Sequence, residues 1–245
     1  MKLDQIITGI SAGPRRTMIY GPHGVGKSTF GAQAPGEIFL PTEDGIGNID
    51  CASFPLIESL DDFKAALRSL YREEHSYQTI VIDSLDWLER MIWATACLDA
   101  GEKNIADIPY GRGYANALPI WEGILKSLTK LRLDKKLGVV LIAHSKIERF
   151  EDPEQESYDR YSPKLHKLAS GICQEWSDEV LFATYKVFTK QNEEGFNRKR
   201  TVGVGTGERV LRTNTRPAHI AKNRLGLPDE IPMTWTAYAD HFPKG

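Results

Sequence analysis

A glycine-rich segment near the start of the chain has the residue types and spacing of a phosphate-binding loop. It fits the pattern GxxxxGK(S/T) in full, with the residues Gly21-Pro22-His23-Gly24-Val25-Gly26-Lys27-Ser28. The glycines allow the backbone to curl so that its N–H groups point inward at an anion. Lys27 would reach the β- and γ-phosphates of a nucleotide, and the Ser28 hydroxyl would coordinate Mg²⁺. We therefore expect residues 21–29, which end at Thr29, to hold a nucleoside triphosphate.

An aspartate further along the chain supplies the second half of such a site. Asp83 directly follows the apolar run Thr79-Ile80-Val81-Ile82, which is typical of a buried strand. A carboxylate at that position would hold the Mg²⁺ shell through water. It could alternatively cap the next helix, but a phosphate loop upstream favours the metal role.

Hydrolysis also requires a group that orients or deprotonates the attacking water. Glu43 follows the second apolar run, in the segment Thr42-Glu43-Asp44-Gly45. Asp86 and Glu89 lie just after Asp83 and are rivals for the same role. Periodicity does not choose among the three, and Glu43 could also be a solvated loop residue.

These residues need a sheet that brings strand ends together, and the hydrophobic pattern predicts one. Short apolar runs predict buried strands at 17–20, 37–40, 79–82 and 139–143. Spacing near 3.6 predicts helices at 28–33, 60–74, 86–100 and 119–133, with loops at 104–116 and 151–163. From residue 180 the period changes to two, which predicts strands at 180–188, 201–204 and 209–212, with turns at 192–195 and 205–207.

The predicted fold is therefore α/β, with a mostly parallel central sheet flanked by helices and a C-terminal antiparallel β-meander. We expect one domain over residues 1–245. Its core would span about 16–190, and the meander with the C-terminal segment about 178–245.

Composition narrows the class of protein further. The 245 residues carry a formal net charge of -2, which excludes a histone-like polycation and a polyacidic chain. No apolar run is long enough for a transmembrane helix, and no signal-peptide core follows the first lysine. The three cysteines are odd in number and far apart, as expected of reduced core thiols in a cytoplasmic protein.

The near-zero net charge conceals a strong segregation. Residues 31–63 contain seven acids, Glu43 among them, and no Lys or Arg, whereas residues 186–224 contain ten bases and three acids. Two solvated faces would explain this pattern. Head-to-tail packing of subunits, or a basic strip for a polyanion, would explain it equally well.

The order of these motifs resembles that of the RecA-like NTPases. The sequences of the motifs are similar to those of a family of phage-borne nucleotide-binding proteins. These are short RecA-like ATPases that include phage single-strand annealing recombinases. The similarity spans about Arg16 to Pro232 and is carried by residues 19–30, 42–45, 110–114 and 143–146. It implies a Mg·ATP-dependent ATPase that acts on single-stranded DNA in phage recombination or replication. It also implies a ring or filament with ATP at subunit interfaces, and a phage single-strand binding protein as a possible partner.

The resemblance assigns roles to single residues. Glu43 takes the position of the catalytic glutamate, and His144 that of the sensor of the γ-phosphate, although glutamine is common there. Lys222 and Arg224, in Ala221-Lys222-Asn223-Arg224-Leu225-Gly226, match basic residues that reach a neighbouring subunit's γ-phosphate in hexameric helicases. Alternatively, His144 could be a histidine at the edge of the core with locally satisfied hydrogen bonds, and Lys222 and Arg224 could belong to a solvated basic turn.

Two loops lie where RecA-like proteins contact single-stranded DNA. In the first, Tyr110 and Tyr114 could stack on bases and Arg112 could pair with phosphate, or the tyrosines could pack against the protein. The second, residues 145–167, has five bases and six acids, which argues against strong DNA binding there. A denser basic cluster at a predicted hairpin contains Arg198, Lys199 and Arg200, and it too could be merely solvated.

Two other classes remain open from the sequence. A small-molecule kinase would need a lid with arginines that closes over an acceptor, and residues 151–163 are too acidic for that. A nucleotide-gated assembly or adaptor protein with little turnover would use the same phosphate loop.

Overall fold

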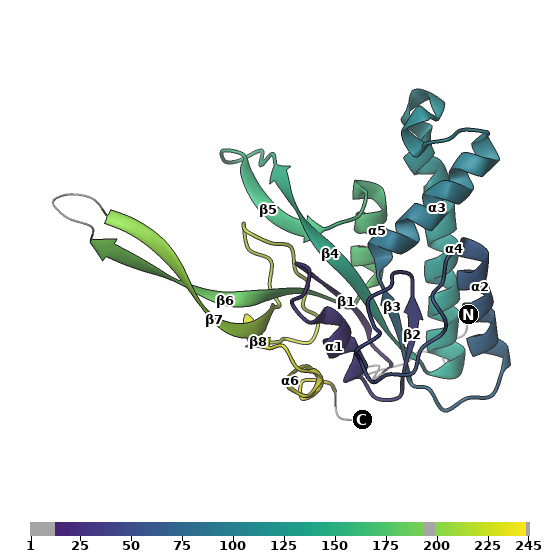
Figure 1. Ribbon diagram of the computed structural model, residues 1–245, viewed down its shortest axis with the longest axis horizontal. Helices are drawn as coiled ribbons and strands as arrows, with labels where there is room; N and C mark the ends of the chain where they lie inside the picture. The colour runs from purple at the N-terminus through teal and green to yellow at the C-terminus, as the bar shows by residue number, and fades with distance from the viewer. Residues whose placement is uncertain (1–12, 194–198, 244–245) are drawn as a thin grey trace, which may run out of the picture.

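An eight-stranded sheet forms the centre of the computed structural model, which describes residues 13–193 and 199–243 (Figure 1). The strands follow the order β2-β3-β4-β1-β6-β7-β8, and β5 pairs with β4 outside this path. Five strands are mutually parallel: β1 Arg16–Gly21, β2 Glu37–Pro41, β3 Thr79–Asp83, β4 Gly138–Phe150 and β6 Glu179–Glu193. This order inserts β4 between β1, which leads into the phosphate loop, and β3, which ends at Asp83.

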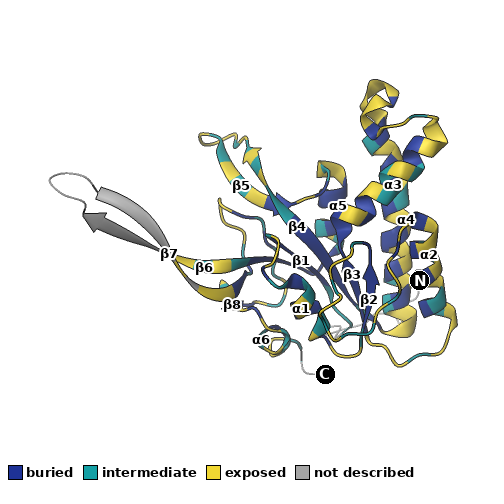
Figure 2. Ribbon diagram, in the orientation of Figure 1, coloured by how far each residue is buried: buried dark blue, intermediate teal, exposed yellow. Residues whose placement is uncertain are grey.

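Helices cover both faces of the sheet, so its central strands are buried on both sides (Figure 2). One face packs against α2 Leu60–Arg72, α3 Leu85–Ala100, α4 Arg112–Lys135 and α5 Lys167–Trp176. The other packs against α1 Lys27–Ala32 and α6 Trp235–Ala239. Burial on both faces explains why these strands appear in the sequence as continuous apolar runs rather than alternating ones.

The helix α2 shows how local sequence sets an element and its packing. Its apolar residues recur at helical spacing and face the sheet, where Phe63 is fully buried. Ser59 caps the first turn by accepting from the Asp62 backbone N–H, and the acids at the N-terminus oppose the helix dipole.

The predicted loop at 104–116 is wrong over its second half. Two short 3-10 turns, η2 Ile105–Asp107 and η3 Pro109–Gly111, lead directly into α4, which begins at Arg112. Gly113 permits this, because a Cβ there would lie 2.1 Å from the Ile105 carbonyl oxygen. The sequence pattern predicts that the helix begins at Pro119, since proline favours the first turn of a helix. In the structure Pro119 lies well inside α4.

The predicted loop at 151–163 is also partly structured. The strand β4 continues to Phe150 and turns back as β5 Tyr158–Pro163, an antiparallel hairpin that extends from the sheet (Figure 1). The alternation of polar and apolar residues is weak here, because much of this hairpin faces solvent. The helix α5 that follows was not anticipated from the sequence pattern either.

The C-terminal antiparallel strands confirm the predicted change of period, with one correction. The predicted strands at 201–204 and 209–212 form one strand, β7 Lys199–Arg212, because the expected turn at 205–207 is a bulge within it. Gly207, at a φ of 77°, accommodates the irregularity. The last strand is β8 Glu230–Pro232. The predicted turn at 192–195 runs beyond the described residues.

The predicted α/β fold is thus confirmed in its main features: a mostly parallel sheet, flanking helices and antiparallel strands at the end. The cysteines are unpaired, with Cys97 and Cys173 buried and Cys51 partly exposed. Within the described ranges, we find no helix with the length and apolar character needed to cross a bilayer.

Candidate nucleotide-binding site

The phosphate loop connects β1 to α1 and is curled around a lysine. Gly24 and Gly26 take positive φ values of 72° and 101°, which residues with a side chain rarely adopt. The Nζ atom of Lys27 donates to the carbonyl oxygens of Gly21 (3.0 Å) and Pro22 (2.9 Å). Burial lowers the pKa of Lys27. The ammonium therefore lies against the loop's own carbonyls, at the position from which it can meet a phosphate.

The next residue joins the loop to the β3 strand. The Ser28 hydroxyl donates to the Asp83 carboxylate over 2.6 Å. Burial raises the pKa of Asp83, and the Ser28 hydrogen bond opposes that shift. A hydroxyl and a carboxylate oxygen this close are the hard oxygen donors that Mg²⁺ takes beside a nucleotide. The donor set fits the predicted metal site.

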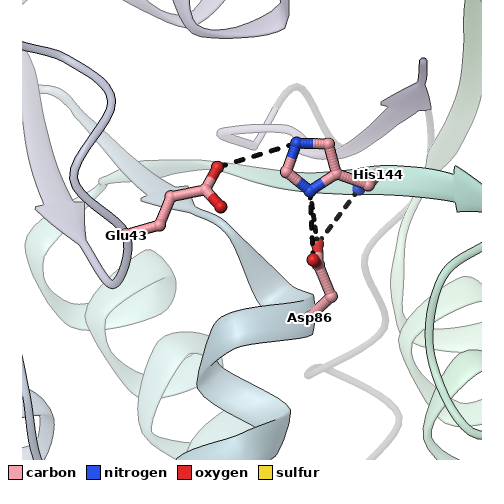
Figure 3. A group of neighbouring side chains, drawn as sticks. All are labelled: Glu43, Asp86 and His144. Atoms are coloured by element: carbon pink, nitrogen blue, oxygen red, sulfur yellow. Dashed lines mark hydrogen bonds and ion pairs between the residues drawn. The ribbon is translucent and has the colours of Figure 1, made fainter. Parts of the chain in front are cut away.

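A second cluster lies at the same edge of the sheet and contains Glu43, Asp86 and His144 (Figure 3). The His144 Nδ1 lies 3.0 Å from both Asp86 carboxylate oxygens, and the His144 backbone N–H donates to Asp86 over 3.1 Å. The opposite ring nitrogen, Nε2, lies 3.7 Å from the Glu43 carboxylate. The three side chains come from the loop after β2, the start of α3 and the middle of β4.

The two carboxylates of this cluster differ in their electrostatics. Burial alone would raise the pKa of Asp86, but hydrogen bonds from the His144 ring and backbone lower it to about 2. Burial raises the pKa of Glu43, although the nearby His144 opposes this shift. Asp86 is therefore the permanent anion of the pair, and Glu43 the carboxylate more ready to accept a proton.

Backbone contacts hold the Glu43 loop against the end of β3. The Thr42 N–H donates to the Asp83 carbonyl (2.7 Å), and the Thr42 hydroxyl accepts from the Ser84 N–H (2.9 Å). The same hydroxyl donates to the Ser84 carbonyl (2.7 Å), and the Asp83–Ser84 peptide bond is cis. The proposed base and the proposed metal ligand therefore belong to one hydrogen-bonded unit.

His23, at the tip of the phosphate loop, stacks on the His144 ring with centroids 3.8 Å apart and planes 23° apart. Burial, together with the charges of His144 and Lys27, lowers the pKa of His23. The stack gives the proposed sensor a direct contact with the loop, which the sequence pattern did not predict.

Five predicted residues are thus brought together at one edge of the sheet: Lys27, Ser28, Glu43, Asp83 and His144. Glu89, a rival for the base, points elsewhere, because its carboxylate accepts the His166 N–H through both oxygens at 3.0 Å. Asp86, the other rival, holds His144 instead. The sequence offered no signal for that pairing, since the two residues are 58 positions apart.

The predicted basic pair lies away from this chain's own phosphate loop. Lys222 pairs with Val180 near the start of β6, whereas the contacts of β6 with the loop lie further along the strand, at Ala183 and Tyr185. Its Nζ donates to the carbonyls of Gln174, Glu175 and Ser177 at the end of α5, so it is not part of a solvated turn. The Arg224 guanidinium contacts Asp178 over 3.3 Å, and its side chain is 53% exposed.

The predicted DNA-contact residues separate into three groups. Tyr110 is 91% exposed, with the Arg112 guanidinium 5.5 Å from its ring. Tyr114 lies in α4 and stacks on His166 with centroids 4.0 Å apart, so it packs against the protein. Lys199 and Arg200 begin β7, and Arg198 lies outside the described residues.

Comparison with known proteins shows the family to which the chain belongs. The sequence profile described as an AAA domain (AAA_24) matches residues 13–225. None of the curated proteins matches the chain. Among solved structures, the chain is similar to the crystal structure of the RadB recombinase, with 11% identity and a TM-score of 0.48 over 92% of this chain and 90% of that one. The chain belongs to the AAA domain family and carries the fold and phosphate loop of a P-loop ATPase.

Proposed function

We propose that this protein is a RecA-like, Mg²⁺-dependent ATPase that assembles head to tail and acts on single-stranded DNA, in phage recombination or replication. The observation that carries the ATPase role is the 2.6 Å contact between Ser28 and Asp83 beside Lys27, with Glu43 and His144 at the same sheet edge. This arrangement supplies a phosphate cradle, a metal site and a base together.

Each side chain has a defined task in hydrolysis. Lys27 binds the β- and γ-phosphates, while Ser28 and Asp83 hold Mg²⁺, which when bound offsets negative charge on the phosphates. Water attacks the γ-phosphorus as the bond to the ADP oxygen breaks, and Glu43 takes the proton that water loses. His144 presents Nε2 to the γ-phosphate because Asp86 holds its other nitrogen.

Head-to-tail assembly is supported by where the charges lie. Arg224 is half exposed beside Asp178, just before the start of β6, where a neighbouring subunit's nucleotide site could meet it. Glu43 lies in the acidic segment 31–63. Packing of the basic late segment of one subunit on the acidic early segment of the next would join opposite charges across each interface.

The DNA role rests on the segment between α3 and α4. Tyr110 is 91% exposed, so packing against the protein does not account for this ring. Base stacking on such a ring contributes roughly 1–3 kcal/mol per base. The β4–β5 hairpin is the weaker candidate, because Lys146 and Arg160 both pair with Glu148.

The test is the ATPase rate with and without single-stranded DNA, at two salt concentrations. Wild type should be stimulated, and the stimulation should fade as salt rises. Tyr110→Ala should lose most of the stimulation while keeping the basal rate, whereas the matched Tyr77→Ala, at an exposed tyrosine before β3, should resemble wild type. A flat response to DNA in wild type would contradict the DNA role. Wild-type ATP affinity in Lys27→Ala would contradict the ATPase assignment itself.

A further inference from the structure

Two side chains of the C-terminal strands reach the phosphate loop. The Tyr185 hydroxyl, on β6, donates to the Gly24 carbonyl over 3.1 Å. The Arg209 guanidinium, on β7, lies over Gly26, where an added Cβ would be 2.8 Å from its Nη1 atom. The motif alone gave no sign of either residue.

The pairing of β6 with β7 explains why both residues reach the same loop. Tyr185 lies directly opposite Arg209 in the ladder, and Ala183 lies opposite Leu211 two positions along. Ala183 and Leu211 are buried in the cluster that packs on α1. Since side chains alternate across a strand, Tyr185 and Arg209 face the same side of the sheet as the phosphate loop.

Two further features fix Arg209 in this position. The ladder shifts register just beyond the Tyr185–Arg209 pair and resumes at Val187–Gly205, so Arg209 lies in the last pair before the irregularity. On its other side, the Arg209 carbonyl accepts from the Met233 N–H over 3.1 Å, which ties the strand to the C-terminal segment. The backbone at Arg209 is therefore anchored while its side chain remains exposed.

The charge of Arg209 lacks a counterion in the part of the chain that the structure describes. Two neighbouring basic residues are paired with Glu230, Arg212 over 2.9 Å and Lys186 over 3.1 Å. A guanidinium held beside a phosphate loop, with no carboxylate of its own, suits an anionic ligand. The nucleotide that the loop would hold carries such charge at that place.

We propose that Arg209 binds the phosphates of the nucleotide in its own subunit, and that Tyr185 holds the loop so that this contact can form. The proposal rests on the ATP binding proposed above. It adds a cation in cis, supplied by the C-terminal strands, to the Lys27 of the motif. It also gives the β6–β7 ribbon a direct part in nucleotide affinity.

The experiment compares ATP dissociation constants at two salt concentrations for wild type and four variants, one of which is Lys27→Ala. Arg209→Gln keeps most of the side chain but removes its charge, and it should weaken binding about tenfold or more and reduce the salt dependence of the dissociation constant. Arg209→Lys restores a charge and should recover part of the affinity. Arg212→Gln, on the same strand but the opposite face, should bind as wild type does.

Thermal unfolding of each variant separates binding from folding, and the exposed Arg209 should be replaced with little change in Tm. If Arg209→Gln loses affinity but keeps the salt dependence of the wild-type dissociation constant, the contact is one of shape and the proposal is wrong. If Arg209→Gln binds ATP like wild type while Lys27→Ala does not, this inference fails and the ATPase assignment stands. If Lys27→Ala also binds like wild type, the ATPase assignment fails.

Discussion

The Nδ1 atom of His144 lies 3.0 Å from both carboxylate oxygens of Asp86. Because the pKa of Asp86 is lowered to about 2, its carboxylate is ionised at neutral pH and can only accept hydrogen bonds. Nδ1 therefore carries the proton, and Nε2 is the nitrogen that faces Glu43. One carboxylate thus fixes the orientation of the proposed sensor and places a proton on Nδ1, so Nε2 donates to a phosphate only when the ring carries both protons.

This relationship predicts the effect of Asp86→Asn. The amide keeps the shape of the side chain but loses the charge that holds the Nδ1 proton, so kcat should fall by roughly 10²-fold. The KM for ATP should change little, since Lys27 and Ser28 are untouched. Steady-state kinetics across pH would also show an altered profile. Asp99→Asn, on the exposed end of the same helix, is the matched control, and an equal loss there would point to a general effect on α3.

Glu43→Gln should retain ATP binding and lose turnover. Glutamine cannot accept the proton from water, and a positioned base typically contributes 10²–10⁴ in rate. Equilibrium binding and phosphate release measured on the same preparation would separate the two steps. Unchanged turnover would exclude Glu43 as the base. Glu37→Gln, at the other end of β2, should leave both properties intact.

The basic pair Lys222 and Arg224, near the start of β6, should divide into a structural and a functional residue. Lys222→Ala removes a donor shared by three carbonyls at the end of α5 and should cost about 1–3 kcal/mol of unfolding free energy. Arg224→Ala, at a half-exposed ion pair, should cost less than about 1 kcal/mol.

If Arg224 acts on a neighbouring subunit, only Arg224→Ala should reduce ATP turnover with little change in the free energy of unfolding. Urea unfolding measures the first effect, and the ATPase rate over a range of protein concentration measures the second. A turnover that is normal at every concentration would exclude Arg224 as a trans residue.

Glu89 should make stability depend on pH. Burial raises its pKa from 4.5 to about 7, although the His166 N–H opposes the shift. The folded state therefore favours the protonated acid, and its contribution to stability is present below pH 4.5 and lost as pH rises through about 7. The loss should reach at most about 3 kcal/mol.

The variant Glu89→Gln cannot ionise, so it should gain stability relative to wild type between pH 5 and pH 8. Urea unfolding at both pH values measures the difference in unfolding free energy between the variant and wild type. The titration of other groups contributes equally to both proteins and cancels in this difference. The exposed Glu122→Gln should show no such trend. A difference between Glu89→Gln and wild type that stays constant with pH would show that Glu89 titrates normally.

The positions of the residues proposed to contact the nucleotide were predictable from the sequence because their geometry is local or set by parallel strands. Lys27 and Ser28 belong to one motif, and Asp83 and His144 follow apolar runs whose carboxyl ends meet at one sheet edge. The start of α4 was not predictable, because the glycines around Arg112 favour a loop until Gly113 packs on Ile105.

The contacts of Asp86 and Arg209 could not be predicted for a related reason. Asp86 meets His144 through the packing of α3 on β4, and Arg209 reaches Gly26 through the antiparallel register of two strands. Both contacts depend on tertiary placement, which neither residue type nor spacing records. Propensity and periodicity describe one element at a time.

The strand β4 is continuous from the buried centre of the sheet, past His144, to Phe150 at the far end of the hairpin (Figure 1). Six residues of extended chain separate these two positions, a span of about 20 Å at the usual rise. No break in the strand divides the part beside the phosphates from the part in solvent. A small tilt of the β4 backbone at His144 during nucleotide turnover would therefore produce a larger displacement at the tip of the hairpin, because one continuous strand joins the two positions.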